Sequence, residues 1–180
     1  MKCHTIVSLA VALFLCLAGR AWAVSPNGEE LAAARQWTSE HLGGDPEALP
    51  FSFTFAGKPS TDLLKSWARE RSTSKLDQWR KSHKLKYVDP QSKVEVRCEA
   101  IEYLDYPTVE WTLYFRNRGT VDSPILEDIQ ALNATWERDQ ESEFLLHHAV
   151  GSPANGSDYG PLETLLGPEA VKRISAAGGR

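Results

Sequence analysis

Residues 108–117 read TVEWTLYFRN and carry the clearest two-residue alternation in the chain. Successive side chains of a β-strand point to opposite faces, so residues two apart share a face. The stretch therefore predicts a strand that buries one side, bounded by Tyr106-Pro107 and by a turn at residues 117–120. Its apolar face consists of Val109, Trp111, Leu113 and Phe115, and its polar face of Glu110, Thr112, Tyr114 and Arg116.

The same alternation recurs on both sides of this stretch. Phe51, Phe53 and Phe55 place three rings on one face of a predicted strand. Residues 84–88 and 94–103 are separated by the polar connector DPQSK, which predicts a hairpin. Further strands are expected at residues 125–137, 143–150 and 162–166, whereas residues 61–75 fit a helical turn or, slightly better, an irregular strand. Short strands joined by turns favour an all-β fold, a sandwich or a barrel.

The two-residue alternation also predicts which residues lie in the core. Cys98 shares a face with small and β-branched neighbours, so we interpret it as a small core residue. In residues 125–137 the core candidates are Ile125, Ile129, Leu132 and Trp136. We interpret a set of carboxylates as a solvated or interdomain face: Glu95, Glu99, Glu102 and Glu110.

The first 23 residues have the order of a secretory signal peptide. Lys2 and His4 precede an apolar run over residues 6–17, and Ala21-Trp22-Ala23 supplies small residues before a cleavage site. The run is too short for a transmembrane anchor, and a lipoprotein would need a small residue directly before Cys16. We therefore expect an exported protein, periplasmic or extracellular, with no membrane anchor.

Residues 24–50 are expected to form a short helix and a linker ahead of the main domain. Ser25 is the predicted N-cap, and Glu29 and Glu30 stand in the first turn, where the helix dipole favours acids. The remaining residues, 51–180, are expected to form one β-sandwich domain.

Charge and cysteine content exclude several classes of protein. Loss of Lys2 and Arg20 with the signal peptide leaves 18 basic and 24 acidic residues, a net charge of −6. That balance disfavours a nucleic-acid partner. Cys98 is then the one remaining cysteine, so no internal disulfide is expected.

Few residues suggest chemistry, and we expect neither a cofactor nor a metal. His147 and His148 are adjacent, and on a strand they would point to opposite faces rather than to one metal ion. The loop at residues 151–161 carries Asp158 beside Tyr159, a carboxylate and a ring of the kind that bind a sugar. The alternative is a solvated loop in which Asp158 forms a turn.

Three segments resemble a known family. They are YPTVEWTLYFRNRGTVDSPILEDIQAL at residues 106–132, EFLLHHAVGSPANGSDYGPLE at residues 143–163, and AAGGR at residues 176–180. Their order is similar to the N-terminal domain of secreted bacterial α-galactosidase-type glycoside hydrolases, family 36 and its relatives. The resemblance covers residues 51–180 and departs from the family pattern at Ala154, where a cysteine is expected.

The resemblance implies a supersandwich-like antiparallel β-sandwich that precedes a (β/α)₈ barrel. In such enzymes the barrel carries the catalytic aspartates and hydrolyses terminal α-linked sugars. The resemblance therefore implies that this chain holds no catalytic residue, is truncated before the barrel, and meets carbohydrate through that barrel. The residues that would rim the sugar pocket are His148, Asp158 and Tyr159.

Three functions remain open from the sequence. The first is a non-catalytic, supporting N-terminal domain of an exported glycoside hydrolase. The second is a stand-alone carbohydrate-binding module, and the third is a complete small enzyme of unknown class.

Overall fold

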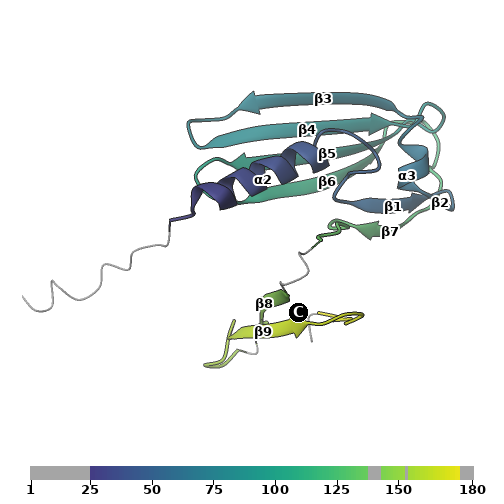
Figure 1. The fold of residues 1–180 in the computed structure, drawn as a ribbon. Coiled ribbons are helices and arrows are strands. Elements are labelled where there is room, and N and C mark those ends of the chain that lie inside the picture. Colours follow the sequence, from purple (N-terminus) through teal and green to yellow (C-terminus); the bar gives the residue numbers. More distant parts are fainter. Residues whose placement is uncertain (1–24, 138–142, 153, 175–180) are drawn as a thin grey trace, which may run out of the picture. The chain divides into compact units, whose positions relative to one another are not determined.

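In the described chain far more residues lie in strands than in helices, and the strands form antiparallel sheets, as Figure 1 shows. Within the described residues every strand pairing is antiparallel, and the strands are accompanied by two helices, α2 (Gly28–His41) and α3 (Ser60–Leu63). The prediction of a mostly β, antiparallel fold is confirmed.

The computed structural model describes residues 25–137, 143–152 and 154–174. The predicted signal peptide lies outside these residues. The chain divides into two compact units, the first ending at Ala134 and the second beginning at Thr135, and each is described by itself. Neither described helix has the length and apolar character needed to cross a membrane.

The first unit is built on a four-stranded sheet. Its order is β3 (Ala68–Lys75), β4 (Arg80–Val88), β5 (Val94–Tyr103) and β6 (Val109–Asn117). The predicted hairpin is confirmed as β4 and β5. Its turn is held by Asp89, whose carboxylate accepts hydrogen bonds from the backbone N–H and the hydroxyl of Ser92, at 2.9 and 2.6 Å.

A second, smaller sheet shares the core of this unit. Its order is β2 (Lys58–Pro59), β1 (Ser52–Phe55) and β7 (Leu126–Gln130). Phe51, Phe53 and Phe55 are buried, as the alternation predicts. The ring of Phe53 meets that of Phe115 on β6 edge-on, with centroids 5.4 Å apart, so the two sheets bury apolar faces in one cluster.

Helix α2 begins at a different cap from the one predicted. Asn27, rather than Ser25, accepts from the Glu30 N–H at 2.8 Å, and the Glu30 carboxylate accepts from the Asn27 N–H at 2.8 Å. This reciprocal capping box satisfies two N–H groups that a helix start leaves unpaired. The acids of the first turn are therefore placed as predicted, with the cap two residues later.

Residues 25–50 take part in the core of the first unit. Trp37 stacks on Trp111 of β6 with centroids 5.7 Å apart, and Leu42 and Leu49 are buried. The Tyr87 hydroxyl donates to the Gly44 carbonyl at 3.1 Å from within the sheet. The helix and its following loop thus cover the apolar face of the sheet.

Two expectations for the first unit need correction. Residues 61–75 contain both alternatives, since Ser60–Leu63 is a helical turn and Ala68–Lys75 is a strand. The core prediction for residues 125–137 is wrong. Strand β7 is short and pairs only at the edge of β1, and Leu126 is the residue there that packs against the core. The predicted core residues are instead exposed: Ile125, Ile129, Leu132 and Trp136.

The second unit is a hairpin. Strands β8 (Phe144–Ala149) and β9 (Pro161–Leu166) pair from Phe144 opposite Leu166 to Ala149 opposite Pro161. Both strands lie where the sequence predicts them, and the described residues between them, 150–152 and 154–160, are outside the strands.

Candidate functional site

The three residues predicted to rim a sugar pocket all belong to the β8–β9 hairpin. The His148 Nε2 lies 3.0 Å from the Thr164 hydroxyl across the two strands. Asp158 uses both oxygens inside the loop: one accepts from the Ser152 hydroxyl and the other from the Asn155 N–H, each at 3.0 Å. These are the bonds of a turn-forming aspartate.

The aromatic ring of Tyr159 is accessible to solvent. Its side chain is 71 % exposed, and its backbone φ of +55° lies in the left-handed region. Only a few per cent of non-glycine residues adopt that region, so the turn places the ring at the cost of some backbone strain. A ring presented in this way can lie on the C–H face of a sugar.

The neighbouring histidines contact different residues. The His147 Nδ1 lies 3.2 Å from a Glu163 carboxylate oxygen, with both side chains exposed to solvent. His148 instead meets Thr164, because adjacent residues of a strand face opposite ways. Within the ranges that the structure describes, no three His, Cys, Asp or Glu side chains are grouped as metal ligands.

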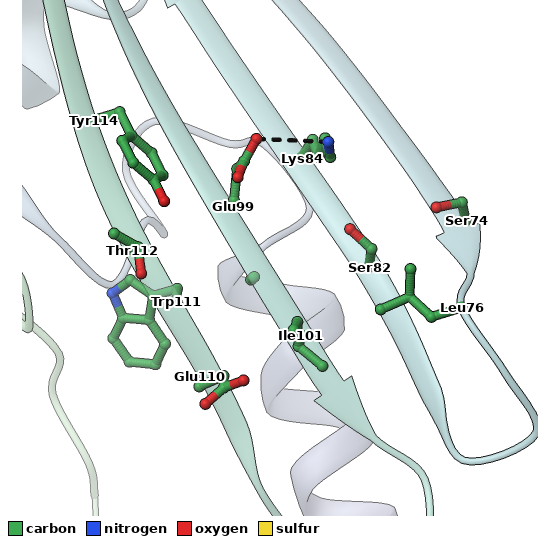
Figure 2. Close-up of a pocket in the computed structure, with 11 residues that line it drawn as sticks. Ser74, Leu76, Ser82, Lys84, Glu99, Ile101, Glu110, Trp111, Thr112 and Tyr114 are labelled. Atoms are coloured by element: carbon green, nitrogen blue, oxygen red, sulfur yellow. Dashed lines mark ion pairs between the residues drawn. The ribbon is translucent and has the colours of Figure 1, made fainter.

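The four-stranded sheet carries a depression on the face opposite the core, which we call the open face (Figure 2). Its volume is about 420 Å³. All four strands contribute polar side chains to it, and sequence reasoning missed it because these residues have the composition of any solvated strand face. The residues that line it include Ser74, Ser82, Lys84, Glu99, Thr112 and Tyr114.

Three charged side chains of the open face lie close to one another. Lys84 Nζ lies 3.5 Å from the Glu99 carboxylate. Arg97 Nε lies 3.2 Å from the same carboxylate, but its N–H does not point at the oxygen, so the two form an ion pair without a hydrogen bond. The Arg97 guanidinium also lies over the Tyr114 ring, 4.8 Å from its centroid. The lining also includes Glu110, whose carboxylate accepts a hydrogen bond from the Tyr103 hydroxyl at 3.0 Å. Hydroxyls and hydrogen-bonded carboxylates suit a neutral, hydroxyl-rich molecule.

Two of the carboxylates predicted to be solvated are buried. Glu95 is 3 % exposed and lies 2.6 Å from the Arg118 guanidinium. Glu102 is 6 % exposed and lies 2.9 Å from the His83 Nε2. The prediction is wrong for Glu102 because it shares the core-facing register of Val94 and Cys98, and for Glu95 because an arginine covers it.

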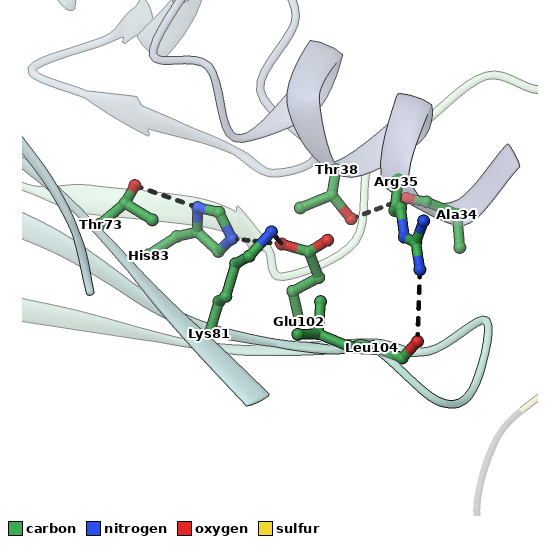
Figure 3. Close-up of polar contacts among 8 residues, drawn as sticks. All are labelled: Ala34, Arg35, Thr38, Thr73, Lys81, His83, Glu102 and Leu104. Carbon is green, nitrogen blue, oxygen red and sulfur yellow. Dashed lines mark hydrogen bonds and ion pairs between the residues drawn. The ribbon is translucent and has the colours of Figure 1, made fainter. Parts of the chain in front are cut away.

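Glu102 belongs to a polar network that joins three strands (Figure 3). The Thr73 hydroxyl lies 3.3 Å from the His83 Nδ1, the other ring nitrogen meets Glu102, and Lys81 Nζ lies 3.8 Å from the same carboxylate. The network gives each buried group a polar partner, which a buried carboxylate requires. Its structural effect is to tie β3, β4 and β5 together beside helix α2.

Cys98 is a core residue, as predicted. Its side chain is 1 % exposed, and burial raises the pKa of its thiol to about 12. At neutral pH the sulfur is therefore protonated and shielded from solvent, which removes it from the candidate nucleophiles.

Comparisons with known proteins do not assign a family or a function to the chain. The chain matches no protein-family model, no curated protein and no solved structure.

Proposed function

We propose that this chain is the non-catalytic N-terminal β-sandwich domain of an exported α-galactosidase-like glycoside hydrolase. In this proposal it supports a (β/α)₈ catalytic domain, and the β8–β9 loop helps to rim the pocket for a terminal α-linked sugar. The protein acts in the periplasm or outside the cell.

The observation that carries the proposal is a run of exposed apolar side chains at described positions between residues 121 and 166, some in the first unit and some in the second, each unit taken by itself. Large apolar side chains that gather on the surface of a protein mark contacts with another protein or domain. The members of this run are exposed by between 38 and 73 %: Val121, Ile125, Ile129, Leu132, Trp136, Phe144, Leu145, Leu162 and Leu165.

The hairpin adds a second reason for a covering domain. Two paired strands are at best marginally stable in water by themselves. Leu145 and Leu165 oppose each other on one face, and Phe144 and Leu166 oppose each other across the next pair of positions, so the hairpin carries apolar side chains on both faces. A catalytic domain packed against the hairpin would bury them.

The sandwich assignment draws support from the first unit. Two antiparallel sheets contribute apolar faces to one cluster there, with Phe53 and Phe115 in direct contact. Shared burial between the inner faces of two sheets is the defining arrangement of a sandwich.

The test uses the genomic sequence after the codon for Arg180. We expect the reading frame to continue into about 250 residues of alternating strands and helices. The full polypeptide should hydrolyse a p-nitrophenyl α-galactoside, and residues 1–180 alone should not. A full polypeptide without a barrel, or one that has a barrel and no α-glycosidase activity, would contradict the proposal.

The loop is tested in the same full polypeptide. Tyr159→Ala should raise KM for an oligosaccharide and leave kcat within about threefold, because a rim residue contributes uniform binding. Tyr106→Ala is the matched control, since Tyr106 is also an exposed tyrosine and lies outside this loop. Equal effects of the two substitutions would count against a role for the loop.

A second candidate is a stand-alone carbohydrate-binding module, favoured by the depression on the open face. Its hydroxyls, paired charges and Tyr114 suit a neutral glycan. Calorimetric titration of the chain with galactosides and plant polysaccharides should then give heat that Tyr114→Ala abolishes. No heat at ligand concentrations of about 1 mM, where weak sugar binding is detectable, would reject this candidate.

A further inference from the structure

Strand β6 forms one edge of the four-stranded sheet, and its outer side has no ladder partner among the described strands (Figure 1). Two hydrogen bonds show which backbone groups face outward. The Tyr103 N–H donates to the Thr108 carbonyl, and the Arg118 N–H donates to the Lys93 carbonyl. Even-numbered residues of β6 therefore point their backbone groups at β5. Because the direction alternates along an antiparallel strand, residues 109, 111, 113, 115 and 117 point theirs to the open edge.

The two edges of this sheet differ in how they are protected. The opposite edge, β3, reads ARERSTSK, and charged side chains along an edge discourage a further strand from pairing. Strand β6 reads VEWTLYFRN, with no lysine, no proline and no shift of register in its pairing with β5. It is nine residues long and rich in β-branched and aromatic residues. It therefore has the features of an edge that accepts another strand.

The sequence of β6 is complementary to itself when read antiparallel. We propose that a second copy of this chain pairs with β6 edge to edge, about a two-fold axis at Leu113, so that two four-stranded sheets become one. In this register every outward-facing residue of β6 meets another, which allows about ten backbone hydrogen bonds. The dimer does not depend on the proposed function.

The side chains match in the same register. On the open face, Glu110 of each copy opposes Arg116 of the other, and these are non-hydrogen-bonded positions, where side chains come closest. Within the described residues Arg116 makes no ion pair, because Glu95, its neighbour on β5, bonds Arg118 instead. On the core side Trp111 opposes Phe115, and aromatic pairs across strands are favourable.

Neighbouring registers are less complementary. An axis at Thr112 places Glu110 opposite Tyr114 and Arg116 opposite Thr108, so both ion pairs are lost. An axis at Tyr114 places Glu110 opposite Arg118, whose guanidinium already bonds the buried Glu95 at 2.6 Å. Glu110 accepts a hydrogen bond from the neutral Tyr103 hydroxyl at 3.0 Å and is in no ion pair with a described residue, so the axis at Leu113 is the one that brings two unpaired, opposite charges together.

The pairing also has a consequence for the open face. Thr112 and Tyr114 line the depression on each copy, and they would oppose each other across the axis. Two depressions would then adjoin and form one longer polar surface.

The experiment is sedimentation equilibrium on the purified chain and on charge-reversed variants. We expect the chain to be a dimer, and Arg116→Glu to raise its dissociation constant at least about tenfold, because two opposed pairs become like-charged. Glu110→Arg should do the same, and the double variant Glu110→Arg/Arg116→Glu should return to within about threefold of the original, since both ion pairs re-form with exchanged sign. Arg71→Glu on β3 is the matched control, with the same change of charge on the protected edge, and should leave the dimer unchanged.

A disulfide reports the register directly. Thr112→Cys combined with Tyr114→Cys should cross-link the two copies on oxidation, since residues at these opposed positions have Cα atoms close enough for a disulfide. Thr112→Cys alone should not cross-link. Any one of four results would overturn the proposal. They are a monomeric chain, equal effects of Arg71→Glu and Arg116→Glu, no recovery in the charge-swapped double variant, and a dimer that does not cross-link. Circular dichroism of every variant separates loss of pairing from loss of fold.

Discussion

Replacing Phe53 by alanine tests how the first unit is held together. The side chain is 2 % exposed, and its ring contacts Phe115 and Trp67 with centroids 5.4 and 6.2 Å away. It comes from β1, whereas Phe115 comes from β6, so one residue connects the two sheets. Phe53→Ala therefore removes a direct ring contact between them.

The expected loss follows from burial and from the two ring contacts. Large-to-small substitution of a buried phenylalanine costs about 3–5 kcal/mol, which includes the cavity that remains. Each well-oriented aromatic pair adds roughly 0.5–1.5 kcal/mol beyond the buried area. Since Phe53 makes one edge-on and one tilted contact, we expect a loss of about 4 kcal/mol in the free energy of unfolding.

Urea unfolding followed by tryptophan fluorescence is the assay, because Trp67 lies beside the altered site. For a unit of this size a slope of about 1.5 kcal/mol per molar urea is typical, so the midpoint should fall by about 2–3 M. Ile129→Ala is the matched control. The two residues lie on the paired strands β1 and β7, yet Ile129 is 49 % exposed, and its loss should be below about 1 kcal/mol. Equal losses from the two substitutions would refute the assignment of the core.

Three further predictions concern single groups of the first unit. Burial raises the pKa of Tyr87 to about 12, so between pH 10 and pH 12 the folded chain keeps a proton that the unfolded chain releases, and this group should lower the stability by about 2 kcal/mol over that range. Tyr87→Phe, compared by urea unfolding, should reduce the dependence on pH, and the part that remains belongs to Cys98, whose pKa burial also raises to about 12. Cys98, whose pKa is likewise raised by burial, should resist iodoacetamide in the native protein and react fully in urea, as mass spectrometry would show, and alkylation at equal rates in both would contradict its burial. Asn27→Ala should lower the free energy of unfolding by about 1 kcal/mol while Ser25→Ala leaves it unchanged, and the reverse order would return the helix cap to Ser25.

Sequence periodicity located most of the strands. The alternation at residues 51–55, 94–103 and 108–117 depends only on backbone geometry, which sends neighbouring side chains to opposite faces. The same rule, applied consistently, would have placed Glu102 with Val94 and Cys98 on the core side. Its burial was therefore available from the sequence, whereas its partners His83 and Lys81 were not, because they come from another strand.

Sequence periodicity predicts much less about the candidate site. The loop with His148, Asp158 and Tyr159 could be identified from composition. Only the folded hairpin shows that both carboxylate oxygens of Asp158 accept hydrogen bonds within the turn. The depression on the open face gathers side chains from four strands. No local pattern in any one of them signals it.

Local pattern determined the position of most strands, where the hairpins turn, and which side chains share a face. Tertiary structure alone decided which faces are covered. Phe53 and Ile129 both have the pattern of core residues, yet one is buried and the other is half exposed. The physical reason is that periodicity sets the direction of a side chain, whereas burial depends on whether another element lies opposite, and that element is distant in the chain.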